Sequence, residues 1–104
     1  MGYYTKHSLN IVSGETDLIT ELREQSDEAR YSLESDGSCS QKSRWYDMEQ
    51  EMIHFSAKHP YVLFEMTGIG EEFPDFWKKY FKGGKVQTCT GNIIYPPFNE
   101  SELA

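Results

Sequence analysis

Residues 45–87 read WYDMEQEMIHFSAKHPYVLFEMTGIGEEFPDFWKKYFKGGKVQ, and the changes of pattern within this stretch decide the fold. Residues 47–59 carry apolar side chains at helical spacing and end just before a proline, which disfavours helix in the residue that precedes it. Asp47 with Gln50 three residues later has the form of a capping box, which places the start of the helix at Asp47. Residues 61–67 then alternate bulky and polar side chains and predict a strand.

The C-terminal part of the same stretch predicts a turn followed by a hairpin. Residues 68–74, GIGEEFP, combine two glycines with a proline, and we expect a turn in which the glycines take positive φ. Gly83-Gly84 then separates two arms rich in aromatic and β-branched residues, 76–81 and 86–95. Two glycines between such arms are a strong signal for a two-residue hairpin turn.

Upstream of this stretch, the sequence predicts a strand, a helix and a loop. Residues 3–12 alternate in the manner of a strand. At Glu15 the pattern changes to apolar residues at helical spacing, which predicts one helix running to about Tyr31. Residues 35–44, SDGSCSQKSR, are small and polar, and we expect them to form a mobile loop.

The order of these elements predicts the α+β class for a single domain, residues 1–104, with residues 98–104 as a tail. We expect about four mostly antiparallel strands with two helices packed on one face, ferredoxin-like in flavour but without the regular βαββαβ order. A chain of 104 residues has room for one core, and seven Tyr, six Phe and two Trp supply large apolar surfaces to fill it.

The net charge of −7 argues against direct binding of nucleic acid, which requires clustered Lys and Arg. An acidic surface suits a partner that is itself basic, although the same charge also serves solubility alone. No apolar run approaches the roughly 20 residues of a membrane span, and the N-terminus lacks the layout of a secretory signal. Cys39 and Cys89 form no CxxC pattern, so we expect free thiols in the reduced cytoplasm of a host cell.

The sequence offers no recognisable catalytic, metal or cofactor site. His54 and His59 stand five residues apart rather than at the i, i+4 spacing of a helical zinc pair. Glu65 is the one carboxylate between large apolar neighbours, and strand alternation gives it a solvent-facing position. Neither cysteine carries the local signature of an activated thiol. We therefore expect a protein that is not an enzyme and uses no cofactor.

Two charged regions are candidates for binding. The predicted N-terminal helix presents an excess of carboxylates, and exposed aromatic residues near charge are natural anchors for a protein partner. The acidic binding residues are Glu21, Glu24, Asp27 and Glu28, and the candidate anchors are Trp45 and Tyr46, with Tyr3, Tyr4 and Trp77. The alternative for Trp45 and Trp77, as for Phe81, is a place in the core, and it is the favoured one for each. The predicted hairpin, residues 76–87, carries Lys78, Lys79, Lys82 and Lys85. Lysines among aromatics can bind single-stranded nucleic acid, but lysines on an edge hairpin commonly protect the sheet edge from pairing, and this guarding role is the favoured interpretation.

The same stretch resembles a recurrent block of small bacteriophage and prophage proteins. The residues that carry the resemblance are Trp45-Tyr46-Asp47, Phe55-Ser56, Pro60, Leu63-Phe64, Gly68-x-Gly70-Glu71-Glu72, Trp77, Lys79-Tyr80-Phe81 and Gly84-Lys85-x-Gln87. The resemblance implies a source, an accessory protein of a phage or prophage, and carries over no catalytic residue. It also implies a way of acting, because small acidic phage proteins often bind a host protein.

The leading hypothesis is a non-enzymatic phage or prophage protein that binds and inhibits a host protein through its acidic surface. A nucleic-acid-binding effector, such as a CRISPR nuclease or another antiviral protein, is the kind of partner that this surface would suit. The alternative hypothesis is a nucleic-acid-binding accessory module that uses the lysines and aromatic residues of the hairpin at residues 76–87.

Overall fold

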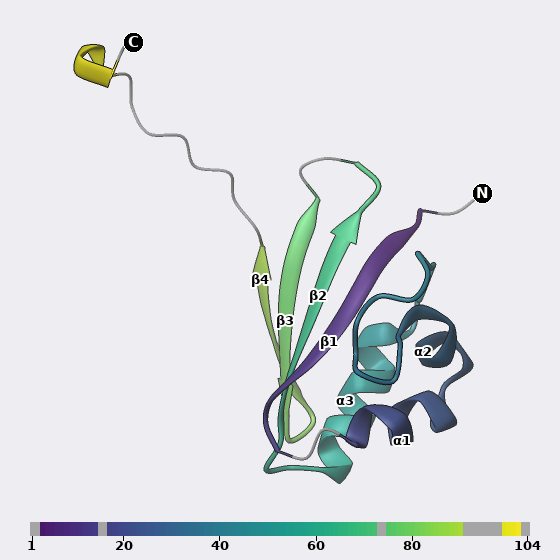
Figure 1. Cartoon of the computed structure of the whole chain (residues 1–104). Coiled ribbons are helices and arrows are strands. Elements are labelled where there is room, and N and C mark those ends of the chain that lie inside the picture. The colour runs from purple at the N-terminus through teal and green to yellow at the C-terminus, as the bar shows by residue number, and fades with distance from the viewer. Residues whose placement is uncertain (1–2, 15–16, 73–74, 91–98, 103–104) are drawn as a thin grey trace.

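The fold is built on a four-stranded antiparallel sheet (Figure 1). The computed structural model describes residues 3–14, 17–72, 75–90 and 99–102. The strands are β1 (Thr5–Ser13), β2 (Leu63–Gly70), β3 (Phe76–Lys82) and β4 (Lys85–Thr90). Their order in the sheet is β1-β2-β3-β4, and each strand runs antiparallel to its neighbour.

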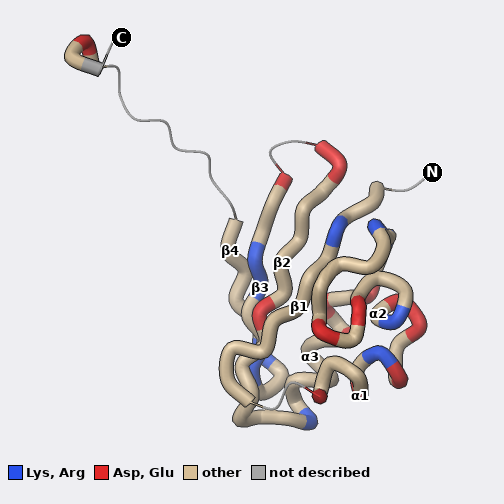
Figure 2. Tube along the Cα trace, viewed as in Figure 1, with Lys and Arg blue, Asp and Glu red and all other residues tan. Residues whose placement is uncertain are grey.

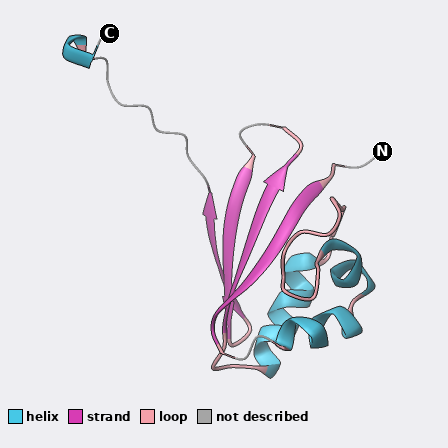
Figure 3. Cartoon of the chain, in the orientation of Figure 1, coloured by secondary structure: helices cyan, strands magenta, loops and turns pink. Residues whose placement is uncertain are grey.

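Three α-helices pack on one face of this sheet (Figure 3). They are α1 (Leu18–Gln25), α2 (Asp27–Ser32) and α3 (Met48–Lys58), and a short 3-10 turn, η1 (Glu100–Glu102), lies near the C-terminus. The predicted α+β class is confirmed, with three helices in place of two. Because the strand order follows the chain order, the sheet is a meander, and the likeness to ferredoxin-like folds is limited to the layering.

The face of the sheet that meets the helices carries the core. Strand register places Ile11, Phe64 and Phe81 side by side across three strands, and Leu9 beside Met66. The buried apolar cluster consists of Leu9, Ile19, Leu22, Ala29, Leu33, Trp45, Met48, Met52, Phe55, Phe64, Met66 and Phe81. The aromatic and sulfur-containing side chains of α3 and β2 thus fill the space that a larger set of aliphatic residues would otherwise occupy.

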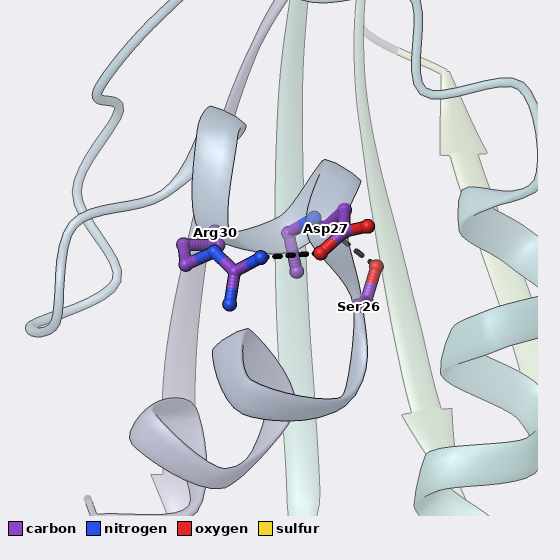
Figure 4. Close-up of polar contacts among 4 residues, drawn as sticks. Ser26, Asp27 and Arg30 are labelled. Atoms are coloured by element: carbon purple, nitrogen blue, oxygen red, sulfur yellow. Dashed lines mark hydrogen bonds and ion pairs between the residues drawn. The ribbon is translucent and has the colours of Figure 1, made fainter.

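The N-terminal helix is broken in two, contrary to the single helix predicted from Glu15 to about Tyr31. Ser26 has extended backbone angles, and its hydroxyl accepts a hydrogen bond of 3.1 Å from the Ala29 N–H, which caps α2 (Figure 4). Ser26 is buried in line with Leu22 and Ala29, so it continues the helical pattern in the sequence. In the structure its capping bond ends one helix and begins the next.

The helix α3 has the predicted range, but its predicted capping box is wrong. It begins after Asp47, whose side chain makes no capping hydrogen bond. Asp47 and Gln50 are both exposed, and the Met48 N–H at the start of the helix donates instead to Trp45 O at 3.2 Å. The helix ends at Lys58 with His59 as its C-cap, as the proline at position 60 requires.

Strand β2 continues through Gly70, so the turn predicted to begin at Gly68 is wrong for residues 68–70. Neither Gly68 nor Gly70 has positive φ. The reason for glycine at position 68 is the indole of Trp77 on β3, because a Cβ there would lie 2.1 Å from Trp77 Cζ2. A close approach between neighbouring strands therefore requires this glycine, and turn geometry does not.

The predicted hairpin at Gly83-Gly84 is confirmed. The two glycines have φ of 59° and 79°, the left-handed values of a two-residue turn that joins twisted strands. The Gly84 N–H also donates a hydrogen bond of 3.0 Å to the Ser56 hydroxyl of α3, which fixes the turn against the helix. The part of the second arm beyond Thr90 lies outside the described residues.

The polar loop of residues 35–44 covers the outer edge of β1. Backbone hydrogen bonds join Thr5 N–H to Ser43 O at 2.9 Å, Ser43 N–H to Thr5 O at 3.0 Å, and Leu9 N–H to Gly37 O at 2.7 Å. These bonds give the loop a defined path along the strand. The expected loop is present, and the expectation that it moves freely is wrong because its backbone is paired.

Candidate functional site

The predicted acidic binding residues lie on α1 and α2, on the β1 side of the molecule (Figure 2). Glu24, Asp27 and Glu28 are exposed. Asp27 forms an ion pair with Arg30 one turn further along α2 (Figure 4). Among the described residues, Glu24 and Glu28 have no such pair, so these two carboxylates remain available to a partner.

Glu21 is placed differently from the other three. Its Oε2 atom lies 2.8 Å from Nε2 of His59, and both side chains are half-buried. In the described part of the chain the two atoms have no hydrogen bond of good geometry. Glu21 therefore joins α1 to the end of α3, and we remove it from the set of residues available for binding.

Exposed tyrosines border these carboxylates. Tyr31 lies three residues after Glu28 and is 57% exposed. With Tyr4, Asp27, Glu28, Ser43 and Arg44 it lines a shallow hollow of about 340 Å³, in which the Arg44 guanidinium lies 5.3 Å from the centroid of the Tyr4 ring. We call Glu24, Asp27, Glu28, Tyr31 and Tyr4 the acidic tyrosine surface. Sequence analysis missed Tyr31, although its spacing of three and four residues from Glu28 and Asp27 places it on their side of the helix.

A second hollow, the aromatic cleft, opens on the helix-side face of the sheet where α3 begins. Its volume is about 450 Å³, and its lining includes Tyr3, His7, Trp45, Tyr46, Glu49, Asp75, Trp77, Lys79, Thr88 and Thr90. Trp45 is only 5% exposed, and its Nε1–H donates a hydrogen bond of 3.0 Å to Glu51. This residue forms a wall of the cleft and cannot project toward a partner as we predicted. Tyr46 is 78% exposed and remains free to do so.

His7 is a buried polar residue of the aromatic cleft. Its ring meets those of Trp45 and Trp77 edge to face, with centroids 5.4 and 6.0 Å away. Ser43 Oγ lies 3.4 Å from His7 Nδ1. Burial lowers the pKa of His7 to about 4, in spite of a hydrogen bond with the Thr5 backbone that acts in the opposite direction. The ring is therefore neutral at pH 7.

We expect the free energy of unfolding to fall as the pH is lowered from about 7 to 4, because unfolded His7 takes up a proton near its ordinary pKa of 6.5 and folded His7 only near 4. The stabilisation is complete above the higher pKa, and about 2 kcal/mol of it is lost by pH 5. Urea unfolding of the native chain and of His7→Gln, each at pH 7 and at pH 5, measures this loss of stability. The native chain should lose about 2 kcal/mol more than His7→Gln.

The exposed histidine His54 provides the control for this measurement. The variant His54→Gln should lose the same stability as the native chain, because this change leaves the buried ring of His7 in place. Parallel losses for His7→Gln and the native chain would show that burial of His7 does not carry the pH dependence.

The charged side chains of the aromatic cleft are paired with other protein groups. Lys79 Nζ lies 2.9 Å from Glu49 Oε1 and 5.2 Å from the ring centroid of Trp77. The Tyr3 hydroxyl donates a hydrogen bond of 2.6 Å to Asp75 Oδ2. The Ser43 hydroxyl next to His7 is buried and also lies 2.5 Å from the Ser32 hydroxyl, so it is held by hydrogen bonds within the fold.

The four hairpin lysines do not form one patch. Lys79 faces the helices and Lys78 faces the open side of the sheet, because successive strand residues point to opposite faces. Lys82 and Lys85 are paired with each other across the end of the hairpin. Lys78, Lys82 and Lys85 therefore share the open face of the sheet, and the nucleic-acid-binding alternative stays a prediction.

Glu65 lies on the open face of the sheet, as strand alternation predicted. Its Oε2 atom is 3.9 Å from Lys78 Nζ, and the side chain is half-buried. A hydrogen bond with Glu65 raises the pKa of Tyr80 above its ordinary value. The three residues form a small polar group in the middle of this face, and no second carboxylate is part of it in the described residues.

The cysteines and histidines stay apart in the structure. Cys39 is exposed in the loop beside β1, Cys89 is half-buried in β4, and both are free thiols. The described residues contain no cluster of three or more His, Cys, Asp or Glu side chains that would hold a metal ion. The longest helix, α3, has 11 residues, and none in the described ranges has the length and apolar character of a membrane span.

Comparison of the chain with protein-family models, with curated proteins and with solved structures finds no match. The function is therefore argued from the geometry of the acidic tyrosine surface and the aromatic cleft, together with the resemblance to phage proteins.

Proposed function

We propose that this chain is a non-enzymatic accessory protein of a phage or prophage that binds a host protein and inhibits it. The host protein is of the class whose basic surface binds nucleic acid, such as a CRISPR nuclease or another antiviral effector. The observation that carries the proposal is the acidic tyrosine surface, where the carboxylate of Glu28 lines the same hollow as the exposed ring of Tyr31, and Glu24 is exposed on the preceding helix α1.

The physical argument is electrostatic complementarity. A chain of net charge −7 is attracted to a basic groove, and carboxylates on a helix face compete with phosphates for the same Lys and Arg. Tyrosine adds contact area at low entropic cost and is enriched among residues that dominate binding energy. A domain of this size can supply the roughly 800 Å² per partner that a stable interface buries.

Charge reversal on this surface tests the proposal. The native chain is immobilised, a nuclease-treated bacterial lysate is passed over it, and bound proteins are identified by mass spectrometry. The double variant Glu24→Lys, Glu28→Lys should recover at least tenfold less of the partner, because each reversal replaces an attraction by a repulsion. Binding of the native chain should also weaken as salt rises.

The matched control is Glu72→Lys with Glu100→Lys. Both residues are exposed and lie outside the acidic tyrosine surface, and the change in net charge is the same. This variant should retain the partner. If the two double variants recover equal amounts, the acidic tyrosine surface is not the interface. When this chain is present in molar excess, the purified partner should no longer bind its nucleic acid. Unchanged binding of the nucleic acid would show that the proposed inhibition is wrong.

A further inference from the structure

The two edge strands of the sheet, β1 and β4, differ in how their outer backbone groups are hydrogen-bonded. The edge of β1 is covered by residues 35–44 through the backbone hydrogen bonds of Thr5 and Leu9. On the other side of the sheet, β4 is the last strand. Among the described residues, no backbone hydrogen bond other than those with β3 involves β4. Within the described ranges, the outer edge of β4 thus has N–H and C=O groups without a backbone partner, which another chain can pair with.

The side chains of β4 do little to protect this edge. Of the four lysines expected to guard it, Lys78, Lys79 and Lys82 lie on β3, and only Lys85 lies on β4, at the hairpin end. Residues 86–90, VQTCT, carry no charge and no proline, the two features that most often prevent strands from pairing at an edge. The guarding function that the sequence suggested is therefore absent from the described length of β4 beyond Lys85.

The turn determines which backbone groups point outward. A two-residue hairpin makes Lys82 and Lys85 a hydrogen-bonded pair, and such pairs alternate with non-bonded pairs along the ladder. The outward N–H and C=O groups of β4 consequently belong to Val86, Thr88 and Thr90. An added antiparallel strand must form its own hydrogen-bonded pairs with these three residues.

We propose that a second copy of this chain pairs with β4 in antiparallel orientation and joins the two four-stranded sheets into one. The register that uses every outward group places Thr88 on the two-fold axis and Val86 beside Thr90 of the partner subunit. It forms about six backbone hydrogen bonds. Threonine opposite threonine is a favourable cross-strand pair, and no lysine lies opposite a lysine.

Charge complementarity argues for a second copy as the occupant. The hairpin end of β3 and β4 carries Lys82 and Lys85, whereas the opposite end of β3 is preceded by Asp75 and, on the β2–β3 connection, Glu71 and Glu72 (Figure 2). Two-fold antiparallel pairing brings the basic end of one subunit alongside the acidic end of the other. This attraction occurs at two symmetry-related places, because a two-fold interface uses the same surface of both subunits.

The strongly acidic part of the chain does not oppose this arrangement. Helices α1 and α2 lie on the β1 side of the sheet, away from β4 (Figure 1). The acidic tyrosine surfaces of the two subunits thus face outward at the ends of the joined sheet, where their mutual repulsion is screened beyond about 10 Å. The aromatic cleft, which Thr88 and Thr90 help to line, comes to border the same interface in each subunit.

Cysteine cross-linking tests the register directly. In a background of Cys39→Ser and Cys89→Ser, Thr88→Cys places two thiols opposite each other in a hydrogen-bonded pair. Their Cα atoms are then about 5.5 Å apart, within the range of a disulfide. Mild oxidation should convert most of this variant to a covalent dimer. The matched control Thr90→Cys faces Val86 of the partner subunit and should stay uncrosslinked. Equal cross-linking of the two variants would overturn the register.

Sedimentation equilibrium of the native chain tests the association itself. A dimer should form in the micromolar to submillimolar range, and Thr88→Pro should weaken it by at least tenfold because proline removes an outward N–H. Proline is tolerated on an edge strand, so the urea midpoint of this variant should stay close to that of the native chain. A native chain that remains monomeric at about 0.5 mM would overturn the proposal, since an interface of this kind should then be populated.

Discussion

Replacing Gly68 by valine should lower the free energy of unfolding by about 3 kcal/mol, because the new side chain and the Trp77 indole cannot occupy the same space. The ring lies within 2.1 Å of the position of the added Cβ, and both residues are held in adjacent strands of the sheet. The conflict is relieved only if the indole swings out of the aromatic cleft. Urea unfolding measures the loss, and tryptophan fluorescence reports the new environment of the ring.

Two comparisons isolate the cause. Gly83→Asn keeps positive φ accessible at a position with no atom closer than 3.9 Å to an added Cβ, so it should cost well under 1 kcal/mol. Trp77→Leu combined with Gly68→Val should cost at least 1 kcal/mol less than the sum of the two single changes, since the smaller side chain removes the clash. Additive losses would mean that contact with Trp77 is not what excludes a side chain at position 68.

Replacing Phe64 by alanine should cost about 3–5 kcal/mol. Phe64 is fully buried on β2, between Ile11 and Phe81 of the neighbouring strands, and its ring centroid is 5.5 Å from that of Phe55 on α3. Truncation leaves a cavity where sheet and helix meet, and the fixed strands on both sides limit its collapse. The measurement is again the urea-dependent free energy of unfolding.

Ile69 on the same strand provides the matched control, because it faces the open side of the sheet and is 54% exposed. The variant Ile69→Ala should cost less than about 1 kcal/mol. If the two alanine variants lose equal stability, the core does not lie on the helix side of the sheet, and the assignment of faces from strand register is wrong.

The class of the fold follows from the sequence because its strongest signals are local. Gly83-Gly84 provides the positive φ that a two-residue hairpin needs, and Pro60 ends α3 whatever the rest of the chain does. Two of the features that were predicted wrongly, the unbroken N-terminal helix and the turn at Gly68, depend on contacts between segments instead. The spacing of Ser26 from its apolar neighbours is that of a continuous helix, and only its hydrogen bond with the Ala29 N–H shows that the helix breaks there. The indole that covers Gly68 belongs to Trp77 on another strand, so the sequence around Gly68 does not reveal it.

For the candidate site too, the local features could be predicted from the sequence and the features that depend on distant contacts could not. The carboxylates Glu24 and Glu28 are local features of a helix, and Tyr31 follows from them by spacing. The aromatic cleft was beyond sequence reasoning because it gathers side chains from β1, the start of α3 and β3. Only the strand register brings His7 beside Trp77, through the pairing of both His7 and Trp77 with Gly68.

The pairing of β1 with β2 has a consequence for synthesis of the chain. Even the closest partners, Ser13 and Leu63, are 63 − 13 = 50 residues apart. At the usual speed of translation, β1 waits on the order of several seconds for its neighbour to be made. All three helices are complete before any strand can pair with β1, so the apolar faces of these segments stay open on the ribosome. Non-local pairing of this kind also slows folding after release. The nascent chain is consequently most exposed to proteases and chaperones until residues 63–82 have emerged.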